Sequence, residues 1–248
     1  HATGTMEEYI KKAIELQIDT FGFSEHAPMN NFEDGYRLTL DKKAYYEKSV
    51  KNLQEKYQDQ INILLGYEVD YIDNNYLLYE IIDADVDYLI GSVHYLNDWG
   101  FDNPEFISEY KKRDINDIWR DYFQAVNNMV KSGKFDIVGH FDLIKIFNYL
   151  PTVEIKSIVL ETLRSIKKNN MVLEINSAGL RKPVNEQYPS KDILELAYEL
   201  DIPITFSSDA HSVDQVGLNY KRCVEIVKSV GYKNCISFNK RDKIVVNF

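Results

Sequence analysis

A carboxylate and an imidazole stand two positions apart where the segment 204–211 changes from apolar residues to small polar ones. Asp209 and His211 follow a short run of β-type residues and two serines, a pattern that indicates a strand opening into a loop. Side chains in that arrangement can point into one cavity, and a carboxylate with an imidazole suits zinc, iron or manganese. One pair alone would be weak evidence, because a single histidine more often makes a local hydrogen bond.

Four other apolar segments also end in a potential metal ligand. They are residues 20–26, 63–68, 88–94 and 136–140, which end in His26, Glu68, His94 and His140. The fifth histidine, His1, stands before the first expected helix, where a preceding strand would end. Because no histidine is left over inside an expected helix, we interpret the set as a metal site. Its candidate ligands are His1, His26, Glu68, His94, His140, Asp209 and His211.

The carboxylates supply the negative charge that a cluster of cations needs. Glu68 and Asp209 both end apolar strands, where an unpaired carboxylate would be costly. The alternative for Glu68 is a strand-end side chain turned to solvent, which the apolar run before it disfavours. Glu174 and Asn176 occupy the same zone of another strand without a histidine, so we expect them to support the ligands or the fold.

The elements that must position these residues alternate between strand and helix. Apolar β-type runs predict strands near residues 19–24, 61–68, 88–94, 135–140, 171–176 and 203–209, and one or two short strands within 235–248. Amphipathic patterns and capping residues predict helices near residues 6–17, 41–58, 76–82, 115–131, 154–169, 190–200 and 219–230. Thr5 and Glu8 form the pattern of a capping box at the start of the first helix.

Near-continuous apolar strands separated by helices are typical of an α/β fold with a parallel sheet, and we expect one domain over residues 1–248. An open doubly wound sheet and a closed barrel both fit this alternation. The candidate ligands decide between them, because they fall at the carboxyl ends of at least five strands. This arrangement favours a TIM-like (β/α) barrel, whose loops all face one mouth. The aromatic segment 95–113 is expected beside that mouth.

Charge and composition limit the classes of partner that the protein could bind. The formal net charge of -10 and the pI near 5.1 argue against general nucleic-acid binding, which needs a basic face. No apolar run approaches the roughly 18 to 20 residues of a membrane span, and no signal-peptide pattern is present, so the sequence predicts a cytoplasmic protein without a membrane partner. Cys223 and Cys235 lack the spacing of a metal or redox motif and are expected to be core thiols. Nothing in the pattern indicates an oligomeric state.

The chemistry of such a site is hydrolysis. A bound cation with open positions lowers the pKa of its water to about 7 and neutralises phosphoryl oxygens. Nearby basic residues indicate a small phosphorylated substrate: Arg181 and Lys182 follow the Glu174 strand, and Lys145 follows His140. Each could clamp a phosphate, although ordinary surface charge stays an alternative for each. No glycine-rich phosphate loop, Gly-x-Ser-x-Gly elbow or cysteine nucleophile signature competes with this interpretation.

Taken together, these segments resemble the polymerase-and-histidinol-phosphatase (PHP) family of metal phosphoesterases along nearly the whole chain. The motifs that carry the resemblance are HATG at 1–4, FSEH at 23–26, LGYE at 65–68, GSVH at 91–94, VGHFD at 138–142, EINSAGLR at 174–181 and SDAH at 208–211. Residues 139–143 and 176–181 are most similar to the histidinol-phosphatase branch of that family.

The resemblance implies a distorted seven-stranded (β/α) barrel that holds two or three divalent metal ions, zinc, iron or manganese. It would assign His1, His26 and His211 to one metal, Glu68, His94 and His140 to another, and Glu68 with Asp209 to a third. The implied reaction converts L-histidinol phosphate to histidinol and phosphate, in histidine biosynthesis. A metal-bridging hydroxide would attack phosphorus, with Glu68 and Asp209 as the catalytic carboxylates and Arg181 holding the phosphate.

One part of the family pattern is missing. Family members carry a His-x-His pair on a first strand that would precede His1, and this sequence contains neither. We therefore expect a chain trimmed at its N-terminus, with the first strand missing from the barrel, because a barrel that lacks a strand exposes sheet edges. Two alternatives for the function remain: another PHP phosphoesterase acting on protein phosphotyrosine, a nucleotide or another small molecule, and a non-catalytic PHP-like binding domain.

Overall fold

The computed structural model describes residues 2–248, and its centre is a parallel sheet. Within these residues the sheet holds six strands in the order β1-β2-β3-β6-β7-β8, each parallel to its neighbours. Their bounds are β1 Thr20–His26, β2 Asn62–Asp70, β3 Tyr88–Ser92, β6 Ile137–Val138, β7 Val172–Asn176 and β8 Ile204–Ser207. The predicted α/β class with a parallel sheet is confirmed.

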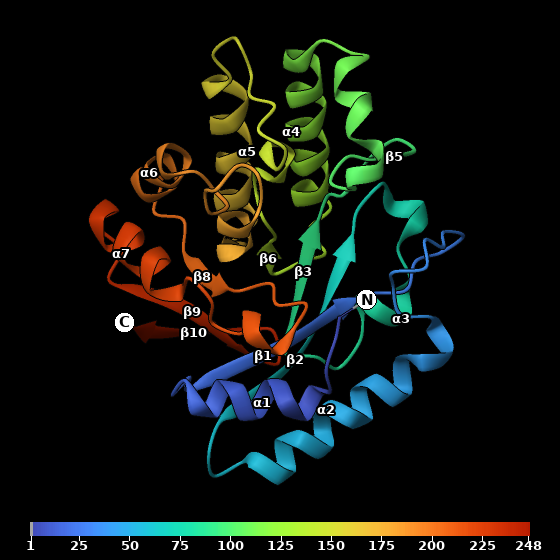
Figure 1. Ribbon diagram of the computed structural model, residues 1–248, viewed down its shortest axis with the longest axis vertical. Coiled ribbons are helices and arrows are strands. Elements are labelled where there is room, and N and C mark those ends of the chain that lie inside the picture. Colours follow the sequence, from blue (N-terminus) through green and yellow to red (C-terminus); the bar gives the residue numbers. More distant parts are fainter. Residues whose placement is uncertain (1) are drawn as a thin grey trace.

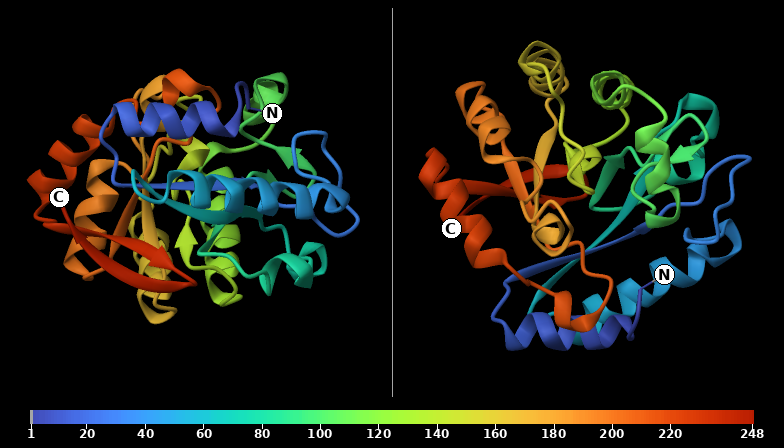
Figure 2. Two further views of the ribbon diagram at one scale, coloured as in Figure 1. Left: turned by 90° about the horizontal axis from the view of Figure 1, so that it is seen from below. Right: turned by 45° about the horizontal axis from the view of Figure 1, so that its top comes forward.

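The helices lie around the outside of this sheet (Figures 1 and 2). They are α1 Met6–Glu15, α2 Lys43–Tyr57, α3 Tyr79–Ile82, α4 Ile115–Lys131, α5 Lys156–Lys168, α6 Lys191–Glu199 and α7 Tyr220–Val230. The capping box of α1 is present, because Thr5 accepts from the backbone of Glu8 and the Glu8 carboxylate accepts from the backbone of Thr5. Among the described residues, no helix is long and apolar enough to cross a membrane.

The sheet curls into a half-barrel instead of closing (Figure 2). Its two edges are β1 and β8, which do not pair with each other in the described part of the chain. Of the expected barrel, the structure confirms the curled parallel sheet with helices outside, but not the closure. Predicted boundaries also shift. β2 continues two residues beyond Glu68 to Asp70, and of the strand predicted over 135–140 only Ile137 and Val138 form β6.

The concave side of the sheet is filled by a small apolar cluster and closed by a hairpin. The hairpin consists of β9 Asn234–Asn239 and β10 Asp242–Asn247, which pair antiparallel. The cluster contains Leu64, Tyr88, Ile90, Ile137, Val172, Ile236 and Phe238. Its strand members alternate with residues that pack toward the helices, as the two-residue period of a strand requires. The prediction of one or two final strands is confirmed.

Two glycines make room for the largest side chain of this cluster. An added Cβ would lie 2.3 Å from Tyr88 at Gly22 and 2.5 Å from it at Gly66, so neither strand could carry a larger residue without displacing the ring. The Tyr88 hydroxyl then donates to the Phe23 carbonyl at 2.9 Å. This cross-strand packing fixes β1, β2 and β3 relative to one another just below the ends that carry the histidines.

The remaining elements connect the strands at the carboxyl end of the sheet. In residues 2–248 they are β4 Tyr95–Leu96, β5 Trp99–Gly100 and the 3-10 helices η1 Leu40–Lys42, η2 Asn74–Tyr76, η3 Pro104–Lys111, η4 Leu143–Lys145, η5 Ser177–Arg181 and η6 Val213–Gln215. The aromatic segment after β3 forms the β4–β5 hairpin and η3. Both cysteines are free thiols. Cys223 is buried in the core as expected, whereas Cys235 is half-buried and packs against the core.

Candidate metal centre

Three adjacent strands and the loop after β6 bring the first candidate ligands together. His26 is the last residue of β1 and lies directly across from Glu68 of β2 in the parallel register. His94 lies two residues beyond β3, and His140 lies two residues beyond β6. Because the strands are parallel and neighbours in the sheet, their carboxyl ends place these four side chains at one edge.

The three imidazoles converge on the Glu68 carboxylate. His140 Nε2 lies 3.0 Å from Glu68 Oε1, and His94 Nε2 lies 3.7 Å from the same oxygen. His26 Nε2 lies 3.8 Å from Glu68 Oε2. All four side chains are largely shielded, with exposures between 4% for His140 and 18% for His26. One carboxylate therefore faces three ring nitrogens of the same type, which is an N/O donor set suited to a divalent cation.

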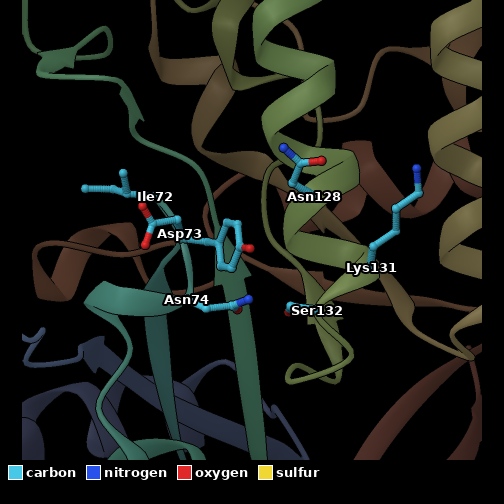
Figure 3. A pocket seen from close by; sticks show the side chains of 7 residues that line it. Ile72, Asp73, Asn74, Asn128, Lys131 and Ser132 are labelled. Atoms are coloured by element: carbon cyan, nitrogen blue, oxygen red, sulfur yellow. The ribbon is translucent and has the colours of Figure 1, made fainter.

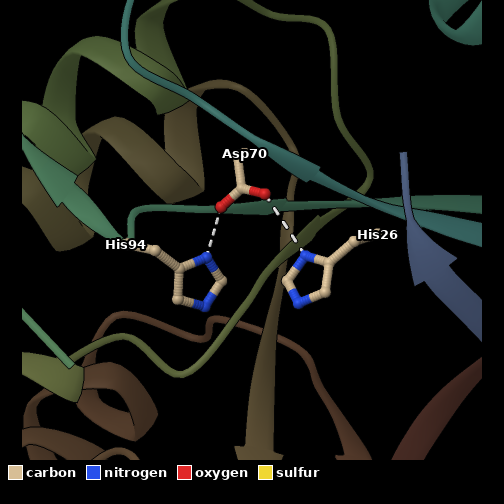
Figure 4. Close-up of side chains that lie close together, drawn as sticks. All are labelled: His26, Asp70 and His94. Carbon is tan, nitrogen blue, oxygen red and sulfur yellow. Dashed lines mark hydrogen bonds and ion pairs between the residues drawn. The ribbon is translucent and has the colours of Figure 1, made fainter. Parts of the chain in front are cut away.

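Asp70 holds two of these rings from behind (Figure 4). Its Oδ2 lies 3.2 Å from His26 Nδ1, and its Oδ1 accepts a short hydrogen bond from His94 Nδ1. When the Nδ1 atoms carry the protons, the Nε2 lone pairs of both rings face Glu68. A carboxylate that fixes the tautomer and orientation of a ligating histidine is common behind metal sites.

Asp70 was not among the residues predicted from the sequence. The available signal was its spacing: Glu68 and Asp70 are two residues apart on one strand and so point to the same face. The predicted strand ended at Glu68, which placed Asp70 in a loop and removed that signal. In the structure Asp70 is 1% exposed and belongs to β2.

The electrostatics of this cluster favour bound positive charge. Burial alone would lower the pKa of His26, but the charges of Glu68 and Asp70 raise it to about 9. Burial also opposes the charged form of His94, whose pKa Asp70 nevertheless raises to about 10. Conversely, the histidines hold the pKa of the buried Glu68 and Asp70 carboxyl groups below their usual range. A metal cation would take the place of the protons at Nε2.

The donor atoms fall into two overlapping groups among residues 2–248. Glu68, His94 and His140 form one group, and His26, Asp70 and His94 form the other, with the donor atoms of each group lying within 4.8 Å of one another. The first group has the same residues as one of the ligand sets that the family resemblance implies. The donor chemistry and the burial of the first group fit a metal of the zinc, iron or manganese type, whereas in the second group Asp70 faces the Nδ1 atoms of the two rings and the Arg37 guanidinium.

The next strands extend the site on the other side of His140. The buried Glu174 of β7 accepts from the His140 backbone N–H at 2.6 Å, and burial raises the pKa of its carboxyl group. Asn176 donates to Glu174 at 3.1 Å and to the Asp209 carboxylate at 3.3 Å. Glu174 and Asn176 therefore connect His140 to Asp209, which follows β8 and adopts a left-handed backbone with φ 47°.

Asp209 and His211 are less closely grouped with the other predicted ligands. His211 Nδ1 lies 3.0 Å from the Asp209 carbonyl, and the His211 side chain is 42% exposed. Neither residue belongs to the two donor groups found in the described chain. His1 lies outside the described residues. The assignment of His1, Asp209 and His211 as ligands stays a prediction.

Lys145 and Arg181, two of the residues predicted to bind phosphate, have different surroundings. The Lys145 ammonium is 2% exposed and pairs with Asp142 at 2.8 Å, Glu186 at 2.7 Å and the Gln187 carbonyl at 2.9 Å. Its ammonium donates hydrogen bonds to Glu186 and Gln187 and forms an ion pair with Asp142. A phosphate could bind there only after one of these contacts breaks.

Arg181 keeps a donor available. Its Nη2 donates to the Ser208 and Asp209 carbonyls at 2.8 and 3.1 Å, and its buried Nη1 has no hydrogen-bond partner in residues 2–248.

Tyr188, which the sequence interpretation did not single out, is 1% exposed, and its hydroxyl also finds no partner among the described residues. Its backbone pairs with Asn176.

A separate cleft lies between the end of β2 and the end of α4 (Figure 3). It has a volume of about 280 Å³ and is lined by Tyr71, Ile72, Asp73, Asn74, Asn128, Lys131 and Ser132. It contains no histidine, and its one carboxylate, Asp73, already caps the turn at Asn75. The cleft therefore offers no second group of metal donors.

Comparison with known proteins places this arrangement in a family. The model of the PHP domain matches residues 1–178. The chain belongs to the PHP family. A probable histidinol-phosphatase of Deinococcus radiodurans is 36% identical over 97% of this chain and 93% of its own length. The histidinol-phosphatase of Bacillus subtilis is 28% identical over 89% of this chain and 92% of its own. The resemblance inferred from the motifs is confirmed.

A solved structure shares the fold of this PHP chain. The histidinol phosphate phosphatase of Lactococcus lactis, crystallised with zinc, L-histidinol and phosphate, superposes with a TM-score of 0.83. It is 24% identical in sequence, and the match covers 98% of this chain and 94% of the other. The likeness extends beyond the residues matched by the PHP domain model and includes β8 and the final hairpin.

Proposed function

We propose that this protein is a metal-dependent phosphomonoesterase that hydrolyses L-histidinol phosphate to histidinol and phosphate, a step of histidine biosynthesis. The observation that carries the proposal is the convergence of three Nε2 atoms on the Glu68 carboxylate at the carboxyl edge of the sheet. Two relatives that align over most of the chain are named histidinol-phosphatases, one of them as probable. The Lactococcus lactis structure holds zinc and both products of that reaction.

Four residues would hold the cations. Glu68, His94 and His140 would form one binding position, and His26 would extend it across β1. We propose that His1, Asp209 and His211 complete a site for two or three ions. When bound, divalent cations supply an acidified water and neutralise charge on the phosphoryl oxygens.

The chain itself would bind and orient the phosphate. Arg181 is fixed through Nη2 to two backbone carbonyls, which leaves Nη1 to donate to a phosphate oxygen. The Asp209 carboxylate lies beside those carbonyls and is held by Asn176, so it can accept a proton from the attacking water. Lys145 would supply positive charge at longer range, because its ammonium is occupied by Asp142 and Glu186.

The unpaired edges of the half-barrel support one further proposal about the fold. A strand inserted between β8 and β1 would pair with both edges and close a seven-stranded (β/α) barrel around the site. The whole of 1–248 would then belong to one domain, since β9 and β10 pack against the concave face of the same sheet.

The test is phosphate release by the purified protein after incubation with zinc, manganese or iron. The proposal expects L-histidinol phosphate to be hydrolysed with a kcat/KM far above that for a phosphotyrosine peptide, a nucleoside monophosphate or p-nitrophenyl phosphate. Preference for one of the other substrates would favour a different PHP phosphoesterase. Stoichiometric metal with no turnover on any substrate would favour a binding domain.

A further inference from the structure

Arg37 is a buried cation in the loop between β1 and η1. Its side chain is 5% exposed. The loop is anchored beside it, because Leu38 N–H donates to the His26 carbonyl at 3.0 Å. Asp34 Oδ1 also accepts from the Tyr36 and Arg37 backbone N–H groups at 3.0 and 3.3 Å. The loop therefore delivers a guanidinium group to a fixed position next to the last residue of β1.

The guanidinium bridges two carboxylates. Nη1 donates to Asp70 Oδ2 and to the Ala27 carbonyl, at 3.2 and 3.3 Å, and Nη2 forms a short ion pair with Asp34. The Phe32 ring lies below it, with 5.0 Å from the guanidinium carbon to the ring centroid. Burying a guanidinium is costly unless it is paired, so this position is maintained by its carboxylate partners. One of those partners is the Asp70 that holds His26 and His94.

The two Asp70 oxygens have different roles. Within residues 2–248, Oδ1 accepts from His94, whereas Oδ2 is shared between His26 and Arg37. Arg37 Nη1 is the third donor to this carboxylate, and it prevents the carboxylate from rotating about its Cβ–Cγ bond. A positive guanidinium against Oδ2 also disfavours a metal cation at the same oxygen. Asp70 is therefore kept as an acceptor for the two Nδ1–H groups, and the Nε2 atoms remain directed at Glu68.

We propose that Arg37 is a positioning residue of the metal centre, which acts through Asp70 to hold His26 and His94 in their metal-binding orientation. This inference rests on the metal site of the proposed function but not on its substrate. It also couples the site to the β4–β5 hairpin, because Tyr95 donates to Asp34 Oδ2 at 2.8 Å and its ring packs on Phe32 at 4.9 Å. Removing a partner behind a ligating histidine typically weakens metal binding about 10- to 100-fold.

The experiment measures the zinc dissociation constant of metal-stripped protein by competition with a chromophoric chelator, together with the Tm in excess EDTA. Arg37→Met keeps an unbranched side chain but removes the guanidinium group and its charge, and we expect zinc affinity to fall about 10-fold or more. Arg37→Lys should recover part of the loss. Millimolar guanidinium ion should recover part of it in Arg37→Ala. Arg120→Met removes an exposed arginine that pairs with Asp117 and should change the affinity by less than about twofold.

A second, milder variant tests the same proposal if Arg37→Met does not fold. Tyr95→Phe removes only the hydrogen bond to Asp34, and we expect zinc affinity to fall a few-fold with an unchanged metal-free Tm. Wild-type zinc affinity in a folded Arg37→Met, or in Tyr95→Phe when Arg37→Met is unfolded, would overturn the proposal. So would an equal loss in Arg120→Met. Zinc affinity is measured without substrate. A protein whose zinc affinity depends on Arg37 but that hydrolyses no histidinol phosphate would therefore refute the proposed function and leave this inference standing.

Discussion

Replacing Glu68 by glutamine removes one negative charge from the point where three imidazoles converge, while the shape of the side chain is kept. At a separation of about 4 Å and an effective dielectric constant of about 20, one charge pair is worth about 4 kcal/mol. The three Nε2 atoms lie 3.0 to 3.8 Å from this carboxylate, so a cation bound among them feels its charge at that range. A loss of about 4 kcal/mol corresponds to roughly a thousandfold weaker metal binding.

The consequence can be measured as a change in thermal stability. Zinc at about 100 times its Kd stabilises the native state by about 2.7 kcal/mol, which for a chain of this size raises Tm by about 5 to 10 °C. At the same zinc concentration Glu68→Gln should show no measurable shift. Differential scanning calorimetry of metal-stripped protein with and without zinc makes the comparison, and Glu195→Gln, an exposed residue of α6, serves as the control. A zinc-induced shift of wild-type size in Glu68→Gln would refute the assignment of Glu68 to the centre of the site.

Three further predictions concern the substrate, protons and packing. Arg181→Ala should raise KM for the phosphomonoester about 10- to 100-fold, with a smaller effect on kcat, because one charge-assisted hydrogen bond to phosphate is lost. Steady-state kinetics would test this. Zinc binding at pH 7 should release protons and tighten as pH rises toward 9 to 10, because His26 and His94, with pKa values of about 9 and 10, are protonated without metal. Calorimetric titrations in buffers of different ionisation enthalpy would count the protons, and a count of zero would contradict the prediction. Gly66→Ala should lower the free energy of unfolding by about 1 to 3 kcal/mol in urea titrations. Gly100→Ala, whose Cβ would meet only ordinary contacts from 3.4 Å, should be close to neutral, and equal stability losses in the two variants would argue against the packing account.

The sequence alone was sufficient to identify the edge of the sheet at which the candidate ligands gather. In a parallel sheet every strand ends at the same edge, so a polar residue at the end of each apolar run is placed near the others without knowledge of distances. This is why His26, Glu68, His94 and His140 could be grouped from their positions on separate segments. The capping box and the paired final strands were also predictable, because both depend on neighbouring residues.

Tertiary structure decided what surrounds those ligands. Asp70 orients two rings only because β1 and β3 flank β2 in a particular register, and Arg37 reaches it only because an irregular loop folds back over β1. Lys145 was predicted to bind phosphate from its place after His140, and only the tertiary structure pairs its ammonium with residues about 40 positions further along the chain. Its role toward phosphate stays a prediction. The periodicity of apolar residues in the sequence predicts which face of a helix or strand a side chain occupies. It does not predict which side chains from other elements contact it, because those contacts depend on strand register and loop conformation.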